Sequence, residues 1–172
     1  MRQVRLPGMR LLCLFTALLA AGCASYTGAN LQPGVSTAAD VERTMGRPVE
    51  RRQAANGETL LWYPHFPFGK VSYAARIGPD GRLIGVEQRM TEQNIAALEP
   101  NRTTLAQVRD LLGPPDSVVE YPRMQREVWT YPVFSRPQHK ELYVQFSPDG
   151  VVREYYVVLH PDEVRNSGPA KD

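Results

Sequence analysis

The sequence is poor in residues that bind metals or form disulfide bonds. Among 172 residues there are only two cysteines, Cys13 and Cys23, and three histidines, and the histidines show no zinc-binding spacing such as HExxH. No serine occupies the GxSxG pattern of a nucleophile elbow, and no glycine-rich phosphate loop is present. We therefore expect no metal, no cofactor and no enzymatic activity.

An excess of charge of one sign is also missing. Twenty lysines and arginines stand against 18 aspartates and glutamates, which gives a formal net charge of +2. Three of the arginines precede residue 22, so the chain that follows has 17 basic and 18 acidic residues, a net charge of −1. This balance gives no support for binding to nucleic acid, and we expect no nucleic-acid partner.

The apolar stretch near the amino terminus is too short to cross a membrane. It covers residues 11–21, eleven residues, whereas a spanning helix needs about 20. A positively charged segment precedes it and small residues follow it, which is typical of a secretory signal peptide at 1–22. Cleavage there removes Cys13 and leaves Cys23 as the single cysteine, so no disulfide can form within the mature chain.

The residues Leu-Ala-Ala-Gly-Cys at 19–23 resemble the lipobox of bacterial lipoproteins. The resemblance implies a diacylglyceryl group on the sulfur of Cys23 and acylation of its new amine, for example by palmitate. Residues 23–30 would then be a lipidated tether, and more than one acyl chain gives stable anchoring. Ala24 in place of aspartate implies the outer membrane, on its periplasmic side. The alternatives are an ordinary signal peptide beside a chance cysteine, and a start at Met9.

The chain repeats itself at an offset of 67 residues. Residues 39–48 read ADVERTMGRP and residues 106–115 read AQVRDLLGPP, and the same offset matches Trp62 with Trp129. Further matches follow in order after slips of one residue, among them two Pro-Asp-Gly sequences. This agreement predicts a tandem duplication, with one unit at 31–98, a second at 99–166 and a frayed tail at 167–172.

Each unit is expected to combine short helices with an antiparallel β-meander of three to four strands, an α+β fold. Thr37 and Thr104 are the expected helix N-caps, and Gly46 and Gly113 the expected ends. A two-residue hairpin is expected at Asn56-Gly57, and alternating side chains predict one buried face of the sheet. The expected strands lie at 49–55, 58–63, 71–77, 82–89, 117–121, 126–131, 140–147 and 151–158, with a bridging helix at 91–98.

The segments WYPHFPFGK at 62–70 and WTYPVFSRPQHK at 129–140 are long, stiffened by proline and aromatic. Aromatic side chains supply large contact area with few rotatable bonds, which suits a protein-binding surface. We expect both tryptophans in the core. The alternative for the other aromatics is that they fold back over the sheet. The candidate protein-binding residues are Tyr63, Phe66, Phe68, Tyr131 and Phe134.

Four arginines, Arg43, Arg47, Arg51 and Arg52, lie around the end of the first helix. Positive charge at a helix carboxyl end complements the helix dipole, and a solvated polar face is the simplest interpretation. The other is contact with lipid headgroups or an acidic partner, because the anchor would hold this unit near a membrane.

A set of positions in the first unit resembles the SmpA/OmlA (BamE-like) family of small outer-membrane lipoproteins. These positions are Gly34, Ser36-Thr37, Val41, Gly46-x-Pro48 and Trp62-Tyr63. The resemblance implies a protein-binding module that supports cell-envelope or outer-membrane protein assembly, with the β-barrel assembly machinery as a candidate partner. A duplicated helix-and-sheet unit also resembles the β-lactamase-inhibitor-protein fold. That resemblance implies, as the alternative, a tandem inhibitor or sequestering module for an envelope enzyme.

Overall fold

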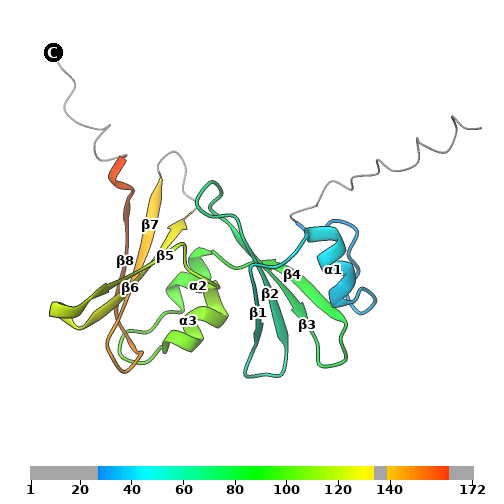
Figure 1. Cartoon of the computed structure of the whole chain (residues 1–172), viewed down its shortest axis with the longest axis horizontal. Coiled ribbons are helices and arrows are strands. Elements are labelled where there is room, and N and C mark those ends of the chain that lie inside the picture. Colours follow the sequence, from blue (N-terminus) through cyan, green and yellow to red (C-terminus); the bar gives the residue numbers. More distant parts are fainter. Residues whose placement is uncertain (1–26, 134–138, 163–172) are drawn as a thin grey trace, which may run out of the picture.

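The computed structural model describes residues 27–133 and 139–162, which form two helix-and-sheet units in tandem (Figure 1). The predicted α+β fold is confirmed. Among these residues, no helix has the length and apolar character needed to cross a membrane. The first unit contains α1 (Ala38–Met45) and sheet 1, in the order β1 (Glu50–Gln53), β2 (Thr59–Pro64), β3 (Ser72–Ile77) and β4 (Leu83–Gln88). The second contains α2 (Glu92–Ala96), α3 (Leu105–Leu112) and sheet 2, in the order β5 (Ser117–Tyr121), β6 (Arg126–Val133), β7 (Lys140–Phe146) and β8 (Val152–Leu159), with the 3-10 helix η1 (Pro122–Met124) after β5.

The helix ends form as their sequences predict. Thr37 and Asp40 make a capping box at the start of α1, and Thr104 repeats it at the start of α3. Hydrogen bonds from Thr37 and then Arg43 lower the pKa of Asp40 to about 2, so this carboxylate stays charged beside the positive helix end. Both helices end at a glycine with positive φ, 87° at Gly46 and 85° at Gly113, a conformation that side chains with a Cβ disfavour.

The first hairpin forms where it was predicted, but the two-residue loop is wrong. The Ala54 amide donates to the Glu58 carbonyl and the Gly57 amide donates to the Ala54 carbonyl. Three residues, 55–57, therefore connect the paired positions, and Gly57 has a φ of 84°. A turn followed by a residue in the left-handed region is the usual form of a three-residue loop.

The two units repeat the same contacts. The Tyr63 hydroxyl donates to the carbonyl of Gly46, and the Tyr131 hydroxyl donates to the carbonyl of Gly113. An isolated bridge joins Thr37 to Arg82, just before β4, and another joins Thr104 to Val151, just before β8. The units are thus built alike, while a gene duplication stays a prediction.

Each helix covers one face of its own sheet with an apolar core. In the first unit Val41 and Met45 of α1 pack on Leu61 and Ala75. The larger core of the second unit is formed by α2, α3 and the inner face of sheet 2, with these members buried: Ile95, Leu98, Val108, Leu112, Trp129, Tyr131, Leu142, Val144 and Phe146. Both tryptophans are buried, as predicted.

Sheet 1 is buried on both faces, whereas the sequence predicted one. Along the long axis the layers follow as α1, sheet 1, α2 with α3, and sheet 2 (Figure 1). Ser72 and Ala74 of β3 alternate with the residues that face α1 and are nonetheless fully buried. Trp62 belongs to this second face, where it lies against Gly113 at the end of α3. The second unit therefore covers the face that the first leaves open.

Candidate protein-binding site

The aromatic segment after β2 divides into anchoring and exposed residues. Tyr63 and Tyr131 are buried, and burial raises the pKa of Tyr63 to about 12. Their side chains therefore stabilise the fold and offer no surface to a partner. Phe66 packs against the core of the second unit, with its ring centroid 6.4 Å from that of Tyr131. Phe68 is 99% exposed.

We expect replacement of Phe66 by alanine to destabilise the protein, because its ring joins the first unit to the core of the second. The loss is expected to be about 1–3 kcal/mol of unfolding free energy, below the range for a fully buried phenylalanine. Phe68→Ala in the same loop is the matched control and is expected to change stability by less than about 0.5 kcal/mol. Urea unfolding followed by circular dichroism measures both. Equal effects would contradict the assignment of Phe66 as an anchor.

The four arginines do not form one group. Arg43 pairs with Asp40 at 2.7 Å and Arg51 pairs with Glu42. Arg47 is exposed, and Arg52 pairs with Asp110 of α3. Arg52 therefore holds the two units together. Of the predicted headgroup or acidic-partner contacts, the other three keep exposed side chains. Cys23 and Phe134 lie outside the described residues.

The contact between the units is largely ionic around Trp62. The Arg109 Nε donates to the Glu50 carboxylate at 3.1 Å, while its guanidinium carbon lies 5.4 Å from the Trp129 ring centre. Arg89 donates to the main-chain carbonyls of Asp110 and Leu111, both at 3.2 Å. These carbonyls lie in the last turn of α3, where helix carbonyls lack partners and positive charge is favourable.

A second ionic cluster extends along the same face of sheet 1. Arg76 donates to Glu58 and Glu87, each at 2.7 Å, and Glu87 also accepts from Arg89. The Arg76 hydrogen bonds lower the pKa of Glu58. Both carboxylates are thus held in the charged form. The cluster reaches Arg89, which in turn contacts α3. This interface was not predicted from the sequence, since its partners lie 21–59 positions apart.

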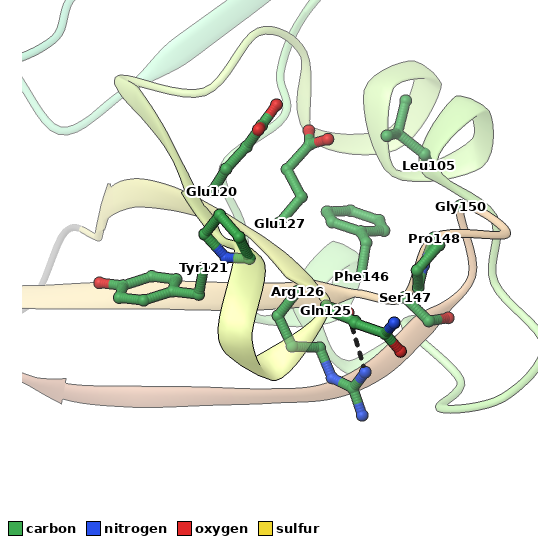
Figure 2. Close-up of a pocket in the computed structure, with 11 residues that line it drawn as sticks. Leu105, Glu120, Tyr121, Gln125, Arg126, Glu127, Phe146, Ser147, Pro148 and Gly150 are labelled. Atoms are coloured by element: carbon green, nitrogen blue, oxygen red, sulfur yellow. Dashed lines mark hydrogen bonds between the residues drawn. The ribbon is translucent and has the colours of Figure 1, made fainter.

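A groove of about 340 Å³ lies between the β5–β6 hairpin and the start of α3. Figure 2 shows Phe146 at its floor, Leu105 on the helix side, and the carboxylates of Glu120 and Glu127 pointing to the same side of the hairpin. These glutamates are direct cross-strand partners, and Glu127 accepts a hydrogen bond from the Trp129 indole. The groove therefore combines an apolar floor with the charged residues Glu120, Glu127 and Arg126. The hydroxyl of Ser147, which also lines it, donates to the Asp149 carboxylate of the adjacent turn.

The outer face of sheet 2 points away from α3 and is rich in tyrosine and valine. It comprises the side chains that alternate with the core residues of β5 to β8. Its apolar and aromatic members are Val119, Tyr121, Val128, Tyr143, Tyr156 and Val158. Tyr156 is 40% exposed and Val119 44%. Large, partly exposed tyrosines are typical of protein interfaces. This face was not predicted, because the predicted binding residues were chosen from aromatic loops. The sequence feature that could have indicated this face is the run Tyr155 to Val158 in β8, in which apolar side chains occupy both faces of the strand.

Residues with catalytic potential serve local structure. Asp80 and Asp149, which match across the repeat, accept hydrogen bonds from the amides of Arg82 and Val151 in their turns. Both aspartates therefore shape their turns. Within residues 27–133 and 139–162, no group of three histidine, cysteine, aspartate or glutamate side chains is placed to hold a metal ion.

The fold and its surfaces define a class: a small α+β domain in which two short helices precede a four-stranded meander. The family model of the outer membrane protein assembly factor BamE domain matches residues 88–156. This segment, from the end of β4 into β8, is therefore a BamE-family domain. The family predicted from the sequence is confirmed, although the motif was taken from the first unit.

Other comparisons add less. No curated protein matches the chain. The crystal structure of a DUF4309 family protein (YjgB) from Bacillus subtilis subsp. subtilis str. 168 is similar to it at 17% identity, over 77% of this chain and 84% of that one, with a TM-score of 0.30.

Proposed function

We propose that the protein is a non-catalytic lipoprotein of the outer membrane that binds another protein and supports the assembly of outer-membrane proteins. The BamE-domain match at 88–156 carries this proposal. The lipobox at 19–23 supports a lipid anchor on Cys23 and a position on the periplasmic side. The protein partner is then the β-barrel assembly machinery.

Two surfaces are available for that role. The outer face of sheet 2 presents partly exposed tyrosines, and Phe68 extends from the loop between β2 and β3. Arg43, Arg47 and Arg51 surround the end of α1, where contact with headgroups or an acidic partner fits their charge. The end of α1 would then face the membrane, and sheet 2 together with the loop that carries Phe68 would contact the protein partner.

The proposal predicts recovery of the β-barrel assembly machinery with the tagged, lipidated protein after cross-linking and solubilisation. Deletion of the gene is expected to lower the amounts of outer-membrane barrel proteins and to raise sensitivity to detergent. Unchanged barrel levels and resistance would contradict the proposal. Recovery of one soluble enzyme in place of the assembly machinery would favour a sequestering module.

The Cys23→Ser variant is the control for anchoring. Because the thiol is the expected site of lipid attachment, this variant is expected to leave the membrane fraction. Retention in membranes would contradict the lipid anchor while leaving the protein contact to be judged by the pull-down.

A further inference from the structure

The two sheets differ in what covers the face that points away from their own helix. In sheet 1 this face carries Trp62 and Arg52 and is covered by α3. Glu50, the first residue of β1, pairs with Trp62, and Ser117, the first residue of β5, pairs with Thr130. Thr130 thus occupies in sheet 2 the place that Trp62 occupies in sheet 1. The outer face of sheet 2 therefore corresponds to the helix-binding face of sheet 1.

We propose that the outer face of sheet 2 docks an α-helix of a partner protein through an apolar stripe on that helix. This inference rests on the proposed function as a protein-binding module and names the kind of segment bound. The covering of sheet 1 by α3 supports this docking, because a meander of the same build already accepts a helix on the corresponding face.

Side chains at corresponding positions determine the character of the helix. Val119 of sheet 2 occupies the place of Arg52 in sheet 1. Arg52 pairs with the buried Leu60, and Val119 pairs with the buried Val128. Tyr156 of β8 likewise occupies the place of Glu87 in β4. Glu87 pairs with Ala74 and Tyr156 pairs with Tyr143, the corresponding residue of the third strand.

Arg52, which pairs with α3, and Glu87 of the ionic cluster are thus replaced by an apolar and an aromatic side chain. The middle of the face, with Val119, Tyr143 and Tyr156, is uncharged, and the charged residues Arg126, Glu141 and Glu154 flank it. An uncharged middle favours an apolar stripe on the docked helix, because burying a charge without its partner is costly.

The face is also shaped before any partner arrives. Tyr143 and Tyr156 stack with centroids 5.5 Å apart, and Gln145 donates to the Tyr156 hydroxyl at 3.3 Å. Beside them a hollow of about 170 Å³ is lined by Tyr121, Met124, Arg126 and Val128. Fixed aromatic side chains lose little freedom on binding, and the hollow offers room for a side chain of the docked helix.

A second copy of this chain fits the face poorly. The helix that would stack there is α1, whose residues Glu42 and Arg43 correspond to Arg109 and Asp110 of α3. Glu42 and Arg43 are charged and already paired within the first unit. Arg109 and Asp110 of α3 pair with Glu50 and Arg52, whose counterparts in sheet 2 are Ser117 and Val119. Head-to-tail stacking would therefore desolvate Glu42 and Arg43 without giving them a charged partner on the sheet.

The test places the photo-cross-linker p-benzoyl-phenylalanine at position 156 of the full-length protein in cells. Position 84 is the matched control, because Ile84 is 42% exposed on β4. Cross-links from position 156 are expected to map to an apolar helix of another protein, and position 84 should give none to that helix. Cross-links to a second copy, to an extended segment or to lipid would overturn the proposal, as would their absence.

A binding measurement separates this inference from the proposed function. Tyr156→Glu is expected to lower recovery of the cross-linked partner at least about tenfold, as for a central interface residue, while Ile84→Glu stays within about twofold. Circular dichroism establishes that both variants fold. Undiminished recovery of the assembly machinery by Tyr156→Glu would overturn the docking face and leave the function standing. A cross-linked helix from an unrelated envelope protein would support the docking face and contradict the function.

Discussion

Replacement of Gly113 by alanine is expected to lower the unfolding free energy by several kcal/mol. A Cβ at this position would lie 2.4 Å from the Trp62 ring, well inside contact distance, so either α3 or Trp62 must move. Overpacking of this kind typically costs about 1–3 kcal/mol. The φ of 85° adds about 1–3 kcal/mol of backbone strain for a residue with a side chain.

Gly46→Ala is the matched control because Gly46 ends α1 as Gly113 ends α3. Its φ is 87°, and a Cβ there would meet no atom within 4 Å. The control therefore carries the backbone strain without the collision. Urea denaturation of both variants should show Gly113→Ala to be less stable by about 1–3 kcal/mol, the overpacking share. Equal losses would show that the end of α3 does not pack tightly on sheet 1.

The features predicted correctly depend on residues close together in the chain. Thr37 and Asp40 form the capping box three positions apart, and Asp80 folds its turn through an amide two positions away. Strand alternation likewise needs only neighbouring residues. Such signals are present in any short window of the sequence, which is why the helices, the turns and the α+β class could be predicted.

The misassigned features depend on register or on distant packing. The sequence matched Trp62 with Trp129, yet Trp129 faces the core of the second unit and Trp62 faces α3. Compared with the hairpin of β1 and β2, the hairpin of β5 and β6 has one more residue between its corresponding paired positions, Ser117 with Thr130 in place of Glu50 with Trp62. A shift of one residue moves a side chain to the opposite face of a strand. Matching the two tryptophans therefore assigned Trp62 to the wrong face of its strand, and the face that joins the units was not predicted.

The burial of some candidate binding residues escaped prediction for a related reason. Loop composition does not distinguish an aromatic residue that anchors the fold from one that awaits a partner. Phe66 and Phe68 stand two positions apart, and only the first finds the core of the second unit. Arg52 likewise pairs with Asp110, 58 positions away. Contacts over such distances follow from the stacking of one unit on the next, which no local pattern contains.

The Trp62→Ala variant is expected to lose about 3–5 kcal/mol of unfolding free energy, the range for truncating a buried tryptophan. Trp62 is fully buried, and its neighbours on that face are the small cluster of Leu60 and Ala74 together with the end of α3. Loss of the ring would leave a cavity between the units, with the ionic contacts of Glu50 and Arg52 around it. We expect the first unit to lose more stability than the second, because the second keeps its larger core.

The Trp62→Phe variant separates packing from polarity at this position. The Trp62 Nε1 has no hydrogen-bond partner among the described residues, so phenylalanine removes a buried donor along with part of the ring. Removal of an unsatisfied donor offsets some of the lost contact, and we expect Trp62→Phe to cost less than about 1.5 kcal/mol.

Fluorescence measures the coupling of the two units directly, because the chain has two tryptophans. Trp129→Phe leaves Trp62 as the reporter of the interface, and Trp62→Phe leaves Trp129 as the reporter of the second core. If the stacked units unfold together, the two reporters give one midpoint in urea that coincides with the loss of circular dichroism. An earlier midpoint for Trp62 would show that the units separate before they unfold. A loss below about 1 kcal/mol in Trp62→Ala would contradict the interface itself, since a buried tryptophan at a stable contact cannot be truncated so cheaply.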